Sequence, residues 1–190
     1  EVNGHIQRLH QEDFCQALGI PARLKYESDG GPGMAAMLGL IRRHSTDVAA
    51  DTDAFIERIA FNYLIGNADA HAKNFSLLYT SMGVRLAPAY DLLSTAIYPR
   101  LSKNMATTIN RMWDPGGIQP IHWAKQLDRL ELSRRLYGAR LADLASRVRN
   151  CFAEAEEWMK ELDCLEPQFS EIKKLVEQRA QILSSISNLG

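Results

Sequence analysis

The chain has 190 residues, of which 46% are hydrophobic and 24% charged, so it favours one compact domain with a buried core and excludes intrinsic disorder. Its 22 basic and 23 acidic residues give a net charge of -1, which excludes a chain-wide nucleic-acid footprint but leaves room for a local basic patch. No apolar run approaches the roughly 20 residues of a membrane span, and no signal peptide opens the chain. The three scattered cysteines, Cys15, Cys151 and Cys164, form no disulfide or zinc pattern. We therefore expect a cytoplasmic location.

The first third of the chain is predicted to be helices broken by turns. A short helix is expected near Phe14 and Leu18, ended by Gly19. The glycine-rich stretch SDGGPG follows no obvious strand and lacks the Lys-Ser/Thr pair of a phosphate loop, which favours a plain turn over a ligand-lining role. The next helix carries four apolar residues at helical spacing, namely Met34, Met37, Leu38 and Ile41.

A longer helix is expected to end at Gly66, with Asp51 or Thr52 as its cap. It presents one wide apolar face, made of Phe55, Ile56, Ile59, Ala60, Tyr63 and Leu64. After a polar loop, a β-hairpin is predicted, with strands at 75–79 and 84–86 and a turn at 81–83. A further short extended piece is expected at 105–110.

From about residue 119 the pattern changes to amphipathic helices. The first block is expected to divide near Leu130 or Gly138, and Pro167 separates it from the last helix. The apolar stripes of these helices indicate packing rather than chemistry. The expected fold is mainly α with a small β-hairpin, organised as residues 1–118 and 119–190.

The polar loop IGNADAHAKNFSLLY, residues 65–79, carries the chemical signal. Asp69 and Asn74 are five residues apart, and Asp91 follows seventeen residues later, past the hairpin that would bring it back beside the loop. Mg²⁺ prefers oxygen ligands and usually takes one or two carboxylates together with phosphate oxygens. This arrangement is typical of phosphoryl transfer, which depends on positioning and on charge neutralisation.

Four polar side chains of the loop, together with Asp91, can be given a role in that reaction. Asn74 and Asp91 would hold the metal, and Asp69 would orient a hydroxyl group and accept its proton. His71 and Lys73 would add positive charge or hydrogen bonds near the phosphates. A metal-dependent hydrolase using Asp69, His71 and Asp91 is the alternative, although no second histidine is near and no HExxH spacing is present.

The spacing matches part of the protein-kinase catalytic loop, in which the catalytic Asp precedes a metal-binding Asn by five residues. Two features depart from it. The kinase histidine position is occupied by Asn67, and the usual DFG is replaced by Asp91-Leu92-Leu93. The pattern therefore indicates kinase-like geometry outside the ordinary eukaryotic protein kinases.

Three stretches resemble the HipA family of bacterial serine/threonine kinases, which are toxins of type II toxin–antitoxin systems. They are RLHQEDFCQALGIPARLKYESDGGPG, NYLIGNADAHAKNFSLL and LAPAYDLLS, and the resemblance runs from about residue 8 to residue 95. The resemblance implies that this chain is the C-terminal lobe of a two-lobed, protein-kinase-like fold. It also implies ATP and Mg²⁺ as cofactors, with Asp69 as the catalytic residue, Asn74 and Asp91 as metal ligands, and Tyr90 joining His71 and Lys73 near the nucleotide.

The same resemblance implies a protein Ser/Thr hydroxyl as substrate, the capacity to autophosphorylate, and a HipB-like helix-turn-helix antitoxin through which the kinase binds operator DNA. Family members are roughly twice as long, and their N-terminal lobe carries the ATP-covering loop and its lysine, for which no candidate precedes Asp69. We expect that lobe to be supplied in cis or in trans, and expect weak or absent turnover from this portion alone.

Two other functions are compatible with the sequence. The same arrangement of loop residues serves in aminoglycoside-type small-molecule phosphotransferases. A deep, acidic substrate-binding region would favour that function. A non-catalytic module that holds an antitoxin or DNA is the second alternative, but the retention of Asp69, Asn74 and Asp91 argues against it.

Overall fold

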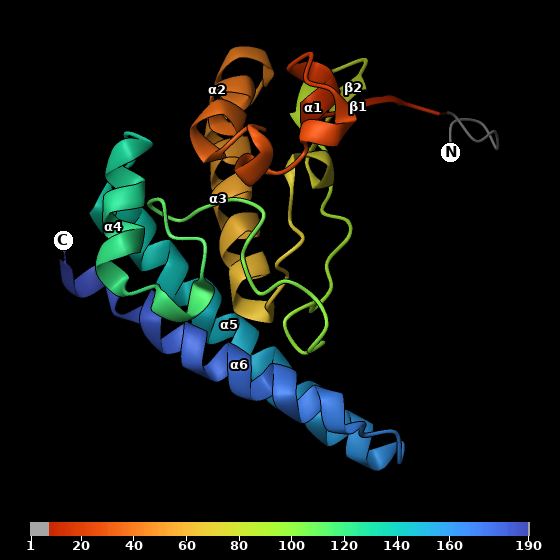
Figure 1. The fold of residues 1–190 in the computed structure, drawn as a ribbon, viewed down its shortest axis with the longest axis vertical. Helices are drawn as coiled ribbons and strands as arrows, with labels where there is room; N and C mark the ends of the chain where they lie inside the picture. The colour runs from red at the N-terminus through yellow and green to blue at the C-terminus, as the bar shows by residue number, and fades with distance from the viewer. Residues whose placement is uncertain (1–7, 190) are drawn as a thin grey trace. The chain divides into compact units, whose positions relative to one another are not determined.

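The computed structural model describes residues 8–189, so the first seven residues of the expected 1–118 portion, and Gly190, lie outside the described residues. Figure 1 shows the helices and strands in chain order. They are β1 (His10–Asp13), α1 (Phe14–Ala17), α2 (Met34–His44), α3 (Val48–Ile65), β2 (Ser76–Thr80), β3 (Gly83–Leu86), α4 (Pro120–Arg129), α5 (Arg134–Glu161) and α6 (Pro167–Ser184). Short 3₁₀ turns lie at Ala22–Leu24, Glu27–Asp29, Ala72–Asn74, Pro115–Gly117 and Ile186–Leu189. The predicted fold class, mainly α with a small sheet, is confirmed.

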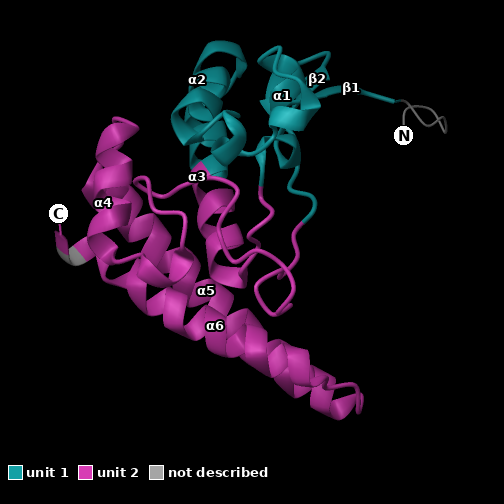
Figure 2. Cartoon of the chain, viewed as in Figure 1, with its two compact units in different colours: residues 1–55, 71–91 teal, residues 56–70, 92–190 magenta. Residues whose placement is uncertain are grey.

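The chain divides into two compact units (Figure 2). The first unit contains residues 1–55 and 71–91, and the second contains residues 56–70 and 92–190. One boundary falls inside α3 and another between Ala70 and His71, within the polar loop. The expected division at residue 118 stays a prediction.

A three-stranded antiparallel sheet with the order β1-β2-β3 belongs to the first unit. The predicted hairpin is present, with Leu77 opposite Leu86, and β1 adds a third strand that places His10 opposite Tyr79. The sequence HQED of β1 has no apolar alternation, so its pairing depends on the backbone edge that β2 offers. The strand runs directly into α1, which begins with a capping box between Asp13 and Gln16.

The core of the first unit centres on three phenylalanines. The ring of Phe14 lies 5.9 Å from that of Phe75 and 6.4 Å from that of Phe55, and the Phe55 and Phe75 rings are 5.4 Å apart. The apolar face predicted for α2 is buried, and its members are Met34, Met37, Leu38 and Ile41. Since Phe75 follows the polar loop directly, this aromatic cluster anchors the end of the loop in the core.

The cap predicted for α3 is wrong. The helix begins at Val48, and Asp47 supplies the cap by accepting a hydrogen bond from the Ala50 amide at 3.1 Å. Asp51 therefore lies inside the first turn of the helix. There its carboxylate is only 3% exposed and serves a different network.

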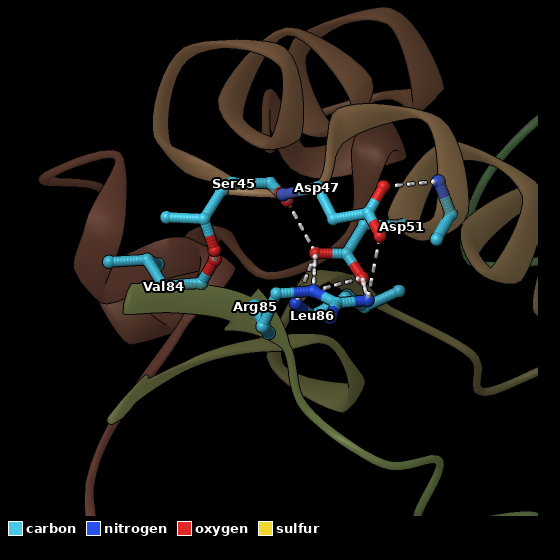
Figure 3. A network of polar contacts seen from close by, with 8 residues as sticks. Ser45, Asp47, Asp51, Val84, Arg85 and Leu86 are labelled. Atoms are coloured by element: carbon cyan, nitrogen blue, oxygen red, sulfur yellow. Dashed lines mark hydrogen bonds and ion pairs between the residues drawn. The ribbon is translucent and has the colours of Figure 1, made fainter. Parts of the chain in front are cut away.

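That network joins α3 to β3 (Figure 3). The Asp51 carboxylate accepts hydrogen bonds from Arg85 Nη2 at 2.9 Å, from Ser45 Oγ at 2.6 Å and from the Leu86 amide at 2.8 Å. Burial alone would raise the pKa of Asp51, but these hydrogen bonds and the charge of Arg85 together lower it below its ordinary value. The network fixes the strand that leads toward Asp91.

The second unit is built from the rest of α3 and the C-terminal helices. The predicted division near Leu130 is correct, because α4 ends at Arg129 and α5 begins after its cap, Ser133. Gly138, the other predicted break, lies inside α5, and the separation predicted at Pro167 is present, since α6 begins at that residue. Within residues 8–189, no helix is both long and apolar enough to cross a bilayer.

The extended piece predicted at 105–110 does not form a strand, and its only regular feature is an isolated bridge between Ile109 and Met112. Its backbone serves other partners instead. The Met105 amide donates to the carbonyl of Trp113 at 2.9 Å, and the Ala106 amide donates to the carbonyl of Ala68 at 2.8 Å. The segment therefore braces the polar loop.

Candidate active site

The part of the loop that belongs to the second unit begins with a turn at Gly66. Its φ of 80° lies in the left-handed region, which glycine adopts without strain. A Cβ atom at this position would lie 2.5 Å from the Leu175 side chain and 2.8 Å from the Ala96 Cβ. The Gly66 carbonyl accepts hydrogen bonds from the amides of Thr95 at 3.0 Å and Ala96 at 2.9 Å. The turn therefore depends on a residue without a side chain.

Neutral hydrogen bonds hold the residues that lead to Asp69. The Thr95 hydroxyl accepts from the Ala68 amide at 2.8 Å and donates to the Gly66 carbonyl at 3.2 Å. Asn67 is buried, donates to Asn62 Oδ1 at 2.9 Å and accepts from the Asp69 amide at 3.2 Å through its own Oδ1. Asp69 itself is half-buried. Its backbone is thus fixed by side chains that carry no charge.

A buried arginine from α6 supports the end of α3 before this turn. Arg179 is 8% exposed, donates to the Tyr63 carbonyl and places its guanidinium 4.9 Å from the centre of the Tyr63 ring. Burial lowers the pKa of Arg179 and raises the pKa of Tyr63 to about 12. A cation near the last carbonyls of a helix is favourable. From the sequence, α6 was interpreted as a packing helix only. A lone arginine in its apolar stripe was the signal for the role of supporting α3.

The first unit carries both proposed metal ligands: Asn74 lies in the loop and Asp91 follows the hairpin. Asn74 closes the 3₁₀ turn, and its side-chain amide donates to Asp91 Oδ2. Asn74 is only 4% exposed, and its Oδ1 has no hydrogen-bond partner among the described residues. Asp91 is exposed and has a φ of 57°, in the left-handed region. The two predicted ligands are therefore in direct contact.

The residues predicted near the phosphates have protein partners. Lys73 Nζ lies 2.5 Å from Asp13 Oδ2, and this hydrogen bond raises the pKa of Lys73. His71 is buried and its ring packs edge-on against Tyr26, with 5.2 Å between the ring centres. Lys73 would have to release or share Asp13 in order to contact phosphate.

Tyr90 bridges two parts of the first unit. Its hydroxyl donates to the Lys73 carbonyl at 2.7 Å and lies 2.5 Å from Ser76 Oγ. Tyr90, which immediately precedes Asp91, is thereby hydrogen-bonded to residues on both sides of Asn74 in the chain.

The donor set fits a hard divalent cation. A buried amide oxygen without a hydrogen-bond partner is costly, and Asn74 Oδ1 is such an atom beside an exposed carboxylate. One amide and one carboxylate suit Mg²⁺, which takes its remaining ligands from water and phosphate. Within residues 8–189, no group of three or more His, Cys, Asp and Glu side chains could hold a metal by itself. The arrangement therefore suits a metal that arrives with phosphate.

Comparison with known protein families identifies the chain. The model of the HipA-like C-terminal domain matches residues 2–156. The chain belongs to this family. The match includes the whole polar loop and Asp91, and it ends within α5, before the helix that supplies Arg179.

Relatives of this HipA-like domain are kinases by name. It is 33% identical over 175 residues to the serine/threonine-protein kinase toxin HipA of Shewanella oneidensis, covering 86% of this chain and 40% of that protein. It is 50% identical over 111 residues to "Putative kinase Y4mE" of Sinorhizobium fredii, covering 58% of this chain and 26% of that protein. The chain thus spans less than half the length of these relatives.

A solved structure shows the same fold. The structure of the Shewanella oneidensis HipA, HipB and operator DNA complex matches all of the HipA-like domain with a TM-score of 0.75 and 28% identity. The chain covers 46% of the matched chain. The prediction of a HipA-type C-terminal portion is confirmed.

Several residues of the candidate site escaped the sequence analysis. Asp13, Tyr26 and Thr95 contact the loop residues but lie far from them in the sequence. Asn67 was noticed only as the replacement for the kinase histidine. In the structure, Asn67 is buried and its side-chain oxygen accepts a hydrogen bond from the Asp69 amide.

Proposed function

We propose that this HipA-like domain carries the catalytic base and the magnesium ligands of a serine/threonine kinase that transfers phosphate from ATP to a protein hydroxyl group. The observation that carries this proposal is the pairing of Asn74 with Asp91, in which a buried amide oxygen without a hydrogen-bond partner lies beside an exposed carboxylate. The kinase names of the relatives support the same reaction class.

In this proposal each residue has a separate chemical role. Asn74 and Asp91 hold Mg²⁺, which when bound neutralises the charge of the phosphates. Asp69 orients the hydroxyl of the substrate and accepts its proton. Its half-buried position and its fixed backbone amide suit that task, because a base must be held in reach of the proton.

His71, Lys73 and Tyr90 would meet the nucleotide. The ammonium of Lys73 would exchange part of its contact with Asp13 for a phosphate oxygen, which keeps its charge paired before and after binding. His71 would contact phosphate from its buried position, and the Tyr90 ring would lie near the nucleotide.

The partners that we propose for the whole protein are taken from the matched complex, which contains HipA, HipB and operator DNA. We propose a HipB-like antitoxin as a partner, with DNA contacted through that complex. An N-terminal lobe would complete the nucleotide pocket, in cis or in trans, because the chain covers only 40% of the HipA toxin kinase it matches. This portion alone should show weak or absent turnover.

The test is phosphoryl transfer from labelled Mg-ATP by this chain joined to the N-terminal lobe encoded beside it. Asp69→Asn keeps the shape of the side chain and removes the base, so transfer should fall by on the order of 100-fold or more. Asp163→Asn, at an exposed position outside the site, is the matched control and should keep full transfer.

Two results would contradict the proposal. Equal label with Asp69→Asn and with the unchanged protein would remove the catalytic role of Asp69. Absence of transfer in both, despite measurable nucleotide binding, would favour a non-catalytic module that holds an antitoxin.

A further inference from the structure

We infer that the hydroxyl of Tyr90 is a tether that positions the two metal ligands, Asn74 and Asp91, against each other. This inference rests on the proposed function, because it concerns the proposed metal site. It gives the Tyr90 hydroxyl a role in that site, in addition to the expected position of the Tyr90 ring near the nucleotide. The tether joins the segment that ends at Asp91 to the chain on both sides of Asn74.

The hydrogen bonds of Tyr90 have a definite direction. A phenol has one proton, and Tyr90 Oη donates it to the Lys73 carbonyl at 2.7 Å. The contact of 2.5 Å with Ser76 must therefore use the serine hydroxyl as donor. Ser76 is 1% exposed, so its hydroxyl needs a protein partner. One oxygen atom thus satisfies two groups that flank Asn74.

The tether acts where the sheet no longer holds the chain. The ladder between β2 and β3 pairs Leu77 with Leu86, and the Ala87 amide donates to the Ser76 carbonyl at 2.8 Å. Residues 87–95 form no helix or strand. Tyr90 reconnects this irregular segment to the loop one residue before Asp91.

Asp91 needs such support. Its φ of 57° costs on the order of 1 kcal/mol for a residue with a Cβ atom, so the surrounding contacts must hold it there. The carboxylate is exposed, and the buried Asn74 is one partner that restrains it. Without the tether, the segment would relax and the two ligands would separate more often.

Tyr90→Phe isolates this role, because phenylalanine keeps the ring and with it any contact of the ring with a nucleotide. Tyr79→Phe is the matched control. It removes a hydroxyl of the same unit that donates to Glu12 Oε2 at 2.6 Å, far along β2 from Asn74. Both variants lose a side-chain hydrogen bond in the first unit, but only Tyr90→Phe should affect the ligands.

The measurement is binding of Mn²⁺, used as a paramagnetic probe for the Mg²⁺ site, by electron paramagnetic resonance on the chain joined to its N-terminal lobe and saturated with a non-hydrolysable ATP analogue, because the site takes its remaining ligands from phosphate. Loss of a partner that orients metal ligands typically weakens affinity 10–100-fold, so we expect the Kd of Tyr90→Phe to rise at least about tenfold. Tyr79→Phe should leave the Kd within about twofold of the unchanged protein. Hydrogen exchange of residues 87–93 without metal should accelerate in Tyr90→Phe alone.

The outcomes separate the inference from the proposed function. An unchanged Kd and unchanged exchange in Tyr90→Phe would overturn the tether while leaving the metal site in place. Asp91→Asn should abolish binding in the same experiment. Binding that survives Asp91→Asn, or no binding by the unchanged protein, would overturn the proposed metal site and the tether with it.

Discussion

The two parts of the polar loop are held by different kinds of interaction. In the second unit, the residues before Asp69 are fixed by backbone groups and by neutral side chains, chiefly Thr95 and Asn67. In the first unit, Lys73 pairs with the carboxylate of Asp13, Asp91 accepts a hydrogen bond from the Asn74 side chain, and the Tyr90 hydroxyl donates to the Lys73 carbonyl. The proposed base is therefore held through its backbone by neutral partners, whereas the proposed metal ligands are held through charged, amide and hydroxyl side chains.

The difference matches the two tasks. A base must stay at one place while the hydroxyl group approaches, and backbone bonds to buried neutral partners do not respond to pH or salt. Metal and phosphate ligands must exchange partners as the nucleotide arrives. Charged side chains such as Lys73, which already has a carboxylate partner, can do so without leaving a charge unpaired.

The sharpest test of the backbone-held part is Gly66→Ala. The substitution combines a left-handed φ with close approach to Leu175 and Ala96, so we expect a loss of about 3 kcal/mol in the free energy of unfolding. Gly19→Ala is the control, since Gly19 has a φ of 65° but no atom within 4 Å of the added Cβ. Its cost should be about 1 kcal/mol, from the backbone alone. Urea unfolding of both variants measures the difference, and equal costs would show that the close packing at Gly66 is unimportant.

Thr95→Val should have the next largest effect. Valine keeps the shape but removes the hydroxyl group that pairs with the Ala68 amide and the Gly66 carbonyl, so the part-buried Ala68 amide loses its partner. We expect a loss of about 2 kcal/mol, within the usual cost of an unsatisfied buried group. Thr107→Val is the matched control, because the hydrogen bond that the Thr107 hydroxyl makes within residues 8–189 is long, at 3.4 Å to the Ala70 carbonyl. Similar urea midpoints for the two variants would argue against the bracing role of Thr95.

The smallest expected effect, and the one that depends on pH, concerns Asp51 in the charged network of the first unit. Asp51→Asn keeps the shape but loses the charge and puts an amide donor where a carboxylate oxygen accepted hydrogen bonds. Near pH 7 we expect a loss of about 1.5 kcal/mol, limited because the Arg85 side chain is 43% exposed and can turn to water.

The pKa of Asp51 is lowered in the folded state, so its contribution is complete above the unfolded pKa of about 3.9. It is lost as the pH falls through the lower, folded pKa. The stabilities of the unchanged protein and Asp51→Asn should therefore converge below about pH 4. The measurement is the urea midpoint at neutral and acidic pH, and a gap that persists in acid would mean that shape, not charge, makes the network stable.

The fold was predictable where a local pattern decides it. The apolar spacing of α2 and the proline that begins α6 identified these helices from the sequence. The strand β1 was missed because its four polar residues form a strand only beside β2. The true cap of α3 was missed because Asp47 and Asp51 are both plausible caps, and only β3 draws Asp51 away.

The candidate site was predictable to the same extent. The spacing of Asp69, Asn74 and Asp91 indicated the chemistry because those residues follow one another along the chain. The residues that contact this part of the chain could not be predicted in the same way, because they are distant in the sequence. Asp13 lies 60 residues from Lys73, and Thr95 lies 27 residues from Ala68. Contacts at such separations depend on the packed fold rather than on any local pattern.

The left-handed backbone at Asp91 has an evolutionary consequence. Glycine fits this conformation with the least strain, and an aspartate codon becomes a glycine or asparagine codon by one nucleotide change. A duplicated gene released from selection for the proposed phosphoryl transfer could accept either change without losing its fold, since glycine relieves the backbone strain while it removes the partner of the Asn74 amide. Codon 91 should therefore be among the first to drift in a decaying copy, and reading that codon in duplicated copies would show which of them are still selected for catalysis.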